Sequence, residues 1–120
     1  MQRIPLFAGV FAALFLALGA AADTLPPAER RKIESLLAAV ERLPDAVFVR
    51  NGKSYPPRSA AKFLRAKWDD RAADVRNADE FITKVATRSS TTGKPYLVRY
   101  ADGREVETAV FLREKLAKFK

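Results

Sequence analysis

The fold of this chain depends most on residues 92–96, whose sequence is Thr-Gly-Lys-Pro-Tyr. Gly93 tolerates a left-handed backbone and Pro95 lacks the N–H group that a helix would need, so a helix cannot continue through this stretch. Residues 77–90 before it have the periodicity of a helix, and residues 96–100 after it are rich in β-branched and aromatic side chains. The stretch therefore predicts a change from helix to strand.

The strand that begins here needs a neighbour, and residues 46–50 are the best candidate. They have the sequence Ala-Val-Phe-Val-Arg and are followed at residues 51–52 by Asn-Gly, a dipeptide typical of tight turns. A second turn signal, Asp-Gly at residues 102–103, predicts a short third strand at residues 105–107. Residues 53–58 contain two prolines and are expected to form a basic loop.

Apolar residues at helical spacing predict about four helices. The first follows the proline pair at residues 26–27, and the other three begin at Ser59, Asn77 and Thr108, whose side chains can each cap a helix N-terminus. Glu80 lies three residues after Asn77, which is the pattern of a capping box. The predicted fold is an α+β domain with a small, mainly antiparallel sheet of two or three strands and about four helices, in the order α-β-α-α-β-β-α.

The composition restricts the chemistry that is available. The chain has 120 residues, which suits one domain, and it has neither cysteine nor histidine. A Cys nucleophile, an imidazole base and the usual zinc and iron ligand sets are therefore excluded, and we expect no cofactor. The net charge is +8, from 22 basic and 14 acidic residues, and this excess favours anionic partners.

Residues 1–22 predict a secretory signal peptide. They contain a long apolar run and end with Ala20 and Ala22 at the two small-residue positions of a signal-peptidase site. Cleavage would leave a single domain at residues 23–120, beginning with Asp23, in the periplasm and without a stable membrane span. A retained membrane anchor is the alternative, because the apolar run is nearly long enough to cross a bilayer. Export disfavours nucleic acid as a partner and favours an anionic envelope component or an acidic protein.

Four segments within residues 46–112 also carry a family resemblance. They are residues 48–52 (Phe-Val-Arg-Asn-Gly), 63–67 (Phe-Leu-Arg-Ala-Lys), 78–82 (Ala-Asp-Glu-Phe-Ile) and 89–96 (Ser-Ser-Thr-Thr-Gly-Lys-Pro-Tyr). Together they resemble the YfeK-like family of small bacterial proteins, which have signal peptides and a domain of unknown function. The resemblance implies a periplasmic protein with no assigned activity, and it brings no catalytic residues.

Hydroxyl groups near an amine suggest a catalytic alternative. Ser90 and Thr91 precede Lys94 at short spacing, as in hydrolases that use a hydroxyl–lysine pair. Such a lysine must lose its proton, and an exposed basic turn provides little of the burial that this requires. The acidic residues between positions 69 and 79 lack the glycine-containing loop of a calcium site, so no metal is expected.

The main functional prediction is a non-catalytic binding module. Pairing of the first two predicted strands would bring their flanking loops together, and basic, aromatic and hydroxyl side chains gather in both loops. The expected binding residues are Arg50, Asn51, Tyr55, Ser89, Ser90, Gly93, Lys94 and Tyr96. The glycines of these turns would also let backbone N–H groups face an anion. A further alternative is a dimeric assembly factor that pairs through an uncovered sheet edge.

Overall fold

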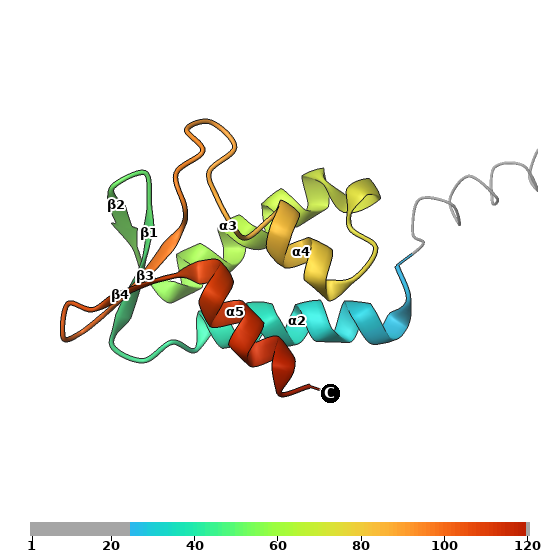
Figure 1. Ribbon diagram of the computed structural model, residues 1–120, viewed down its shortest axis with the longest axis horizontal. Coiled ribbons are helices and arrows are strands. Elements are labelled where there is room, and N and C mark those ends of the chain that lie inside the picture. The colour runs from blue at the N-terminus through green and yellow to red at the C-terminus, as the bar shows by residue number, and fades with distance from the viewer. Residues whose placement is uncertain (1–24, 120) are drawn as a thin grey trace, which may run out of the picture.

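The computed structural model describes residues 25–119, and this part of the chain forms a four-stranded sheet with four α-helices on one side of it (Figure 1). The helices are α2 (Pro27–Glu41), α3 (Pro57–Asp70), α4 (Ala78–Lys84) and α5 (Thr108–Ala117), with a short 3-10 helix, η1 (Ala72–Asp74), between α3 and α4. The strands are β1 (Ala46–Arg50), β2 (Lys53–Tyr55), β3 (Leu97–Tyr100) and β4 (Glu105–Glu107). The predicted α+β class is confirmed, while the predicted signal peptide lies outside the described residues.

The sheet is antiparallel throughout, with the strand order β2-β1-β3-β4. β1 and β3 lie side by side as the sequence predicts, and their register pairs Phe48 with Val98 and Val49 with Leu97. Phe48 and Val98 are buried in the core. This register places the end of β1 next to the loop that leads into β3.

The strand β2 corrects the prediction of a loop at residues 53–58. Asn51 and Gly52 both have a left-handed backbone, with φ of 52° and 78°. Two successive residues of this kind form a hairpin turn whose twist matches that of the strands. The chain therefore returns directly along β1 and pairs Tyr55 with Phe48. The sheet gains a fourth strand, where two or three were predicted.

Two of the predicted helix caps are wrong. α3 begins at Pro57 rather than at Ser59, because proline suits the first turn of a helix, where its missing N–H would have no partner anyway. α5 has Glu107 at its N-cap position rather than Thr108. The Thr108 residue is buried, and its backbone N–H donates a hydrogen bond to the Tyr96 carbonyl at 2.8 Å.

α4 keeps its predicted capping residue but is shorter than expected. The Asn77 Oδ1 accepts a hydrogen bond from the Glu80 N–H at 2.8 Å, and the Glu80 carboxylate in turn accepts one from the Arg76 N–H at 2.9 Å. The helix ends at Lys84, because the hydroxyl-rich residues 87–92 form turns more readily than helix.

The core lies between the helices and the inner face of the sheet. The buried stripe of α2 consists of Ile33, Leu36, Leu37 and Val40, as its spacing predicts. Trp68 of α3 is 5% exposed, and its ring meets the Phe81 ring edge-on at 5.7 Å between centroids. Trp68 is therefore a core residue.

Candidate binding site

A loop at residues 87–96, which we call the hydroxyl loop, connects α4 to β3 and projects beyond both (Figure 1). The Ser89 N–H donates a hydrogen bond to the Lys94 carbonyl at 2.9 Å, which joins the two arms of the loop. The Gly93 N–H donates to the Ser89 carbonyl at 2.9 Å, and Gly93 has a φ of 75°. The turn predicted at this glycine is therefore present, and it requires a left-handed backbone conformation at position 93.

Replacing Gly93 by valine is expected to lower the free energy of unfolding by about 1–2 kcal/mol, because a branched residue is strained in the left-handed region. Apart from Gly93 and its two chain neighbours, no atom of the described residues lies within 4 Å of the position that a Cβ would take, so the cost comes from the backbone conformation. Thermal melting measures the effect. The control is Gly93→Asn, which tolerates this backbone better and should melt closer to the parent protein. A valine variant that melts with the parent would show that the turn is not constrained.

Asn51 joins the β1–β2 turn to the hydroxyl loop. Its Nδ2 donates a hydrogen bond to the Ser89 Oγ at 3.2 Å, and its Oδ1 accepts one from the Thr92 Oγ1 at 2.5 Å. Ser89 is only 4% exposed, and its Oγ also lies 3.0 Å from the Thr91 Oγ1. Two turns that are far apart in the sequence thus form one continuous surface.

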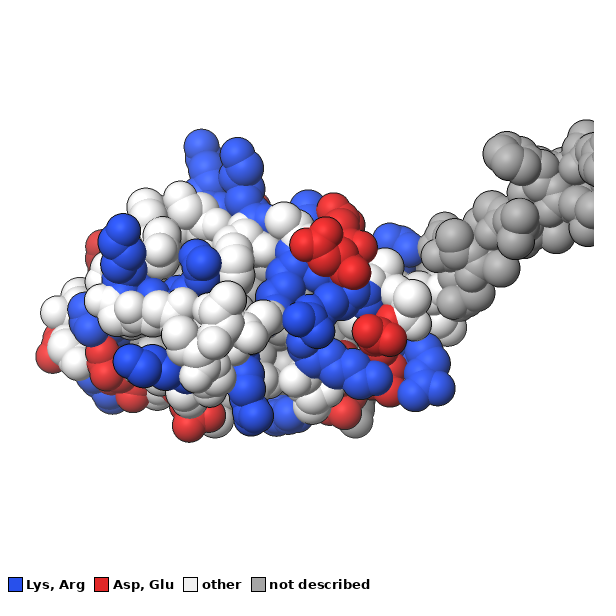
Figure 2. All heavy atoms as spheres, turned by 90° about the horizontal axis from the view of Figure 1, so that it is seen from above, with Lys and Arg blue, Asp and Glu red and all other residues white. Residues whose placement is uncertain are grey.

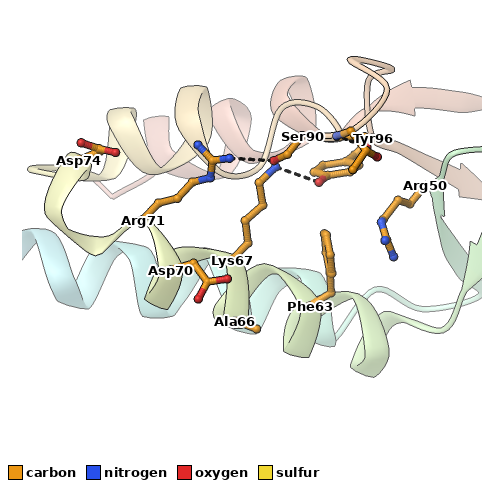
Figure 3. A pocket seen from close by; sticks show the side chains of 11 residues that line it. Arg50, Phe63, Ala66, Lys67, Asp70, Arg71, Asp74, Ser90 and Tyr96 are labelled. Atoms are coloured by element: carbon orange, nitrogen blue, oxygen red, sulfur yellow. Dashed lines mark hydrogen bonds between the residues drawn. The ribbon is translucent and has the colours of Figure 1, made fainter.

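A cleft of about 560 Å³ opens between α3, the end of β1 and the hydroxyl loop (Figure 3). It is lined by Arg50, Phe63, Ala66, Lys67, Asp70, Arg71, Asp74, Ser89, Ser90, Thr91 and Tyr96. Lys67 and Arg71 point from the end of α3 toward the hydroxyl loop, and Arg50 approaches from the other end of the cleft (Figure 3). Three cationic side chains from two separate elements therefore face one cavity.

Lys67 is the buried cation of this cleft. The residue is 9% exposed, and its Nζ donates hydrogen bonds to the Arg88 carbonyl at 2.8 Å and to the Tyr96 hydroxyl at 2.9 Å. Burial, together with repulsion from Arg71 and Arg50, lowers the pKa of Lys67 to about 8. Burial also raises the pKa of the Tyr96 hydroxyl, which therefore remains protonated at neutral pH. The ammonium group is held in place and keeps one N–H for a further partner.

The two arginines are oriented by aromatic and hydroxyl groups. The Arg50 guanidinium carbon lies 4.3 Å from the centroid of the Phe63 ring and 5.7 Å from that of the Tyr55 ring. Cations at this distance are attracted to the ring faces. The Arg71 Nη2 donates a hydrogen bond to the Ser90 Oγ at 3.0 Å. Neither contact neutralises the positive charge.

The charge of the cleft is not balanced by ion pairs. Asp70 and Asp74 lie among the lining residues, but within residues 25–119 neither these nor any other carboxylate forms an ion pair with Arg50, Lys67 or Arg71. Arginines elsewhere in the fold have ion pairs of 2.6 Å, 3.0 Å and 2.7 Å. Basic side chains also gather on the face of the molecule seen in Figure 2. The cleft is thus suited to an anion that residues 25–119 do not supply.

The eight binding residues predicted from the sequence lie partly in the cleft and partly around it. Four of them line it, namely Arg50, Ser89, Ser90 and Tyr96. Tyr96 is 1% exposed, so it forms a wall of the cleft rather than an exposed contact. Asn51 and Tyr55 support the cleft through Ser89 and Arg50, whereas Gly93 and Lys94 are exposed at the tip of the hydroxyl loop and do not line it.

The structure does not bring together the hydroxyl–lysine pair considered from the sequence. Lys94 is exposed, and within the described range its amine makes no hydrogen bond to Ser90 or Thr91. The Ser90 Oγ accepts its hydrogen bond from Arg71. The buried amine of this region belongs to Lys67, which is bonded to a carbonyl and a phenol.

Sequence reasoning missed Phe63, Lys67 and Arg71. Lys67 did carry a signal, since it lies three residues after Leu64 and next to Trp68, on the buried stripe of α3. A charged group at such a position requires polar partners. Its partners come from a loop more than twenty residues later, and no local pattern identifies them.

The described part of the chain contains no cluster of three or more acidic, His or Cys residues that could hold a metal ion. None of the helices in that part combines the length and the apolar character needed to cross a membrane.

Comparison with known proteins confirms the resemblance to the YfeK-like family. The chain is 40% identical over 68 residues to the uncharacterized protein YfeK of Salmonella typhimurium (strain LT2), and the match covers 57% of each chain. No solved structure gives a significant match. The model of a family of unknown function, DUF5329, matches residues 27–120, which include every helix and strand described here. The chain therefore belongs to the DUF5329 family of unknown function.

Proposed function

We propose that this protein is exported to the periplasm and acts there as a non-catalytic binding module for an anionic envelope component or an acidic protein. The observation that supports this most is the cleft, in which Arg50, Lys67 and Arg71 face one cavity and no carboxylate of residues 25–119 pairs with them. A buried cation without a counterion opposes folding. Such groups in clefts mark candidate functional sites, because an external ligand can supply the missing charge.

Export is supported by the N-terminal sequence. A long apolar run is followed by Ala20 and Ala22, which is the pattern that signal peptidase recognises. In the periplasm, the anionic material that meets a basic protein is lipid headgroups, envelope polymers and acidic proteins rather than nucleic acid.

The sheet edges are less suited to binding than the cleft. Both edge strands, β2 and β4, are three residues long, and they carry Lys53, Glu105 and Glu107. Short, charged edge strands oppose pairing with another chain. A function as a dimer formed through these edges is therefore less well supported than binding of an anion in the cleft.

Replacing Arg50 by alanine is expected to reduce capture of a partner when the tagged protein is crosslinked in intact envelopes and pulled down. Arg50 lies in the cleft, so its loss removes a contact to the anion. The matched control is Lys94→Ala, which removes an equal charge from the exposed loop tip and should have a smaller effect. High salt should weaken capture by the parent protein, because it screens the charges. Equal capture by the parent and the Arg50→Ala variant would rule out this use of the cleft.

A further inference from the structure

We propose that the cleft binds a phosphate ester, and that Arg50, Lys67 and Arg71 together hold its phosphate group. This inference rests on the proposed function and specifies the chemistry of the ligand. It is based on the placement of hydrogen-bond donors, on the charge of the cleft and on its size.

The three cationic residues that line the cleft have hydrogen-bond donors without a partner among the described residues. Lys67 has one N–H left after its bonds to the Arg88 carbonyl and the Tyr96 hydroxyl. Arg71 uses a single N–H on the Ser90 hydroxyl and keeps its other donors. The guanidinium of Arg50 rests on aromatic rings and donates no hydrogen bond to any residue in the range 25–119.

The arrangement of these donors suits a tetrahedral oxyanion. Arg50 reaches the cleft from the end of β1, while Lys67 and Arg71 reach it from the end of α3 (Figure 3). Guanidinium groups bind two oxygens of a phosphate at once, and the oxygens of a phosphate point in several directions. A planar carboxylate has fewer oxygens to offer to donors that converge from opposite ends.

The acidic residues of the cleft restrict where the phosphate can lie. Figure 3 shows Asp74 at the end of the cleft remote from Arg50, and Asp70 on the α3 side beside Arg71. Repulsion from these carboxylates disfavours that end. The phosphate group is therefore placed next to Lys67 on the side toward Arg50, within reach of Arg71, and Figure 3 shows the ring of Phe63 between Arg50 and Lys67.

The cleft has room for more than a free ion, and it also offers apolar surface. The cavity measures about 560 Å³, whereas a water molecule occupies about 30 Å³ in the liquid. Phe63 and Ala66 provide apolar surface next to the cations. An organic group attached to the phosphate would contact this surface, and burial of apolar area would add to the binding energy.

The test is calorimetric titration of the purified protein with phenyl phosphate at low salt. We expect saturable binding that is tighter than that of inorganic phosphate. Arg71→Gln should weaken it about tenfold, since a hydrogen bond to a charged group is lost. The matched control is Lys62→Gln, which removes one charge from an exposed position of α3 outside the cleft and should leave the affinity within about twofold of the parent value.

Two sources of the phosphate group can be separated by a second arm with lipid vesicles. Sedimentation with phosphatidylcholine vesicles containing phosphatidic acid, compared with phosphatidylcholine alone, tests a lipid headgroup. Binding to these vesicles that Arg71→Gln weakens would assign the site to a lipid phosphate. Binding to phenyl phosphate without binding to the vesicles would assign it to a soluble ester. Both outcomes support a phosphate site.

The proposal is overturned if neither phenyl phosphate nor the vesicles bind saturably, or if Lys62→Gln weakens binding as much as Arg71→Gln. Circular dichroism of each variant separates a loss of binding from a loss of folding, and Arg71 is exposed, so its variant should fold. If a partner is still captured in an Arg50-dependent way from intact envelopes while phenyl phosphate does not bind, the phosphate assignment is wrong and the proposed binding function stands.

Discussion

Replacement of Tyr96 by alanine is expected to lower the free energy of unfolding by about 3–5 kcal/mol, the usual cost of removing a large buried aromatic side chain. Tyr96 is 1% exposed, and its ring centroid lies 5.2 Å from that of Phe48 and 5.7 Å from that of Phe63. Its hydroxyl is also a hydrogen-bond partner of the buried Lys67 amine. Loss of this residue would therefore leave a cavity where the sheet, α3 and the hydroxyl loop meet.

Thermal or urea denaturation measures this effect, and two variants serve as controls. Tyr96→Phe keeps the ring and removes only the hydroxyl, so it should cost about 1–3 kcal/mol. Tyr100→Ala removes a half-buried tyrosine of the adjoining strand β3 and should cost less than Tyr96→Ala. For a domain of this size the alanine variant at position 96 should melt more than about 10 °C below the parent. A smaller loss than that of Tyr100→Ala would contradict the central position of Tyr96.

The stability of the protein is expected to rise as the pH is raised from 7 toward 10, because of Lys67. The pKa of Lys67 is about 8 in the folded state, against 10.5 for an ordinary lysine. Between these values the unfolded chain binds more protons than the folded chain, so the free energy of unfolding increases with pH. Each pKa unit corresponds to about 1.4 kcal/mol. Because the cleft is open to water and screens the charge, we expect a gain of about 1–2 kcal/mol.

Urea denaturation at pH 7 and at pH 9.5 measures this gain, and Lys67→Met is the matched variant. Methionine keeps a long, unbranched side chain but has no group that titrates. The difference in stability between parent and variant should therefore change with pH, whereas the contributions of other groups cancel. A difference that stays constant between the two pH values would show that Lys67 has the pKa of an exposed lysine.

The parts of the fold that follow from local patterns could be predicted from the sequence. The apolar stripe of α2 and the β-branched and aromatic runs of β1 and β3 identified these elements and their antiparallel pairing. The missed strand β2 is three residues long and ends next to two prolines, so its propensity signal was that of a loop. It forms because the Asn51-Gly52 turn directs the chain back along β1.

The candidate site could be predicted only in part, because it depends on contacts between distant segments. The turn after β1 and the hydroxyl loop were identified by their glycines and hydroxyl residues, and strand pairing was enough to bring them together. The cations of α3 were missed because only the tertiary fold places Lys67 and Arg71 under that loop. Lys94 does not line the cleft, because the fold turns the neighbouring hydroxyls of Ser90 and Thr92 toward Arg71 and Asn51 and leaves Lys94 at the exposed loop tip.

The most direct test of a phosphate-binding cleft is amide NMR of the isotope-labelled protein during addition of phenyl phosphate. If the account is correct, the amide signals that move will be those of Arg50, Lys67, Arg71 and residues 89–91, and the shifts will saturate together. Saturable shifts centred on another basic region, such as Arg113 and Lys115 of α5, or the absence of any saturable shift, would contradict it.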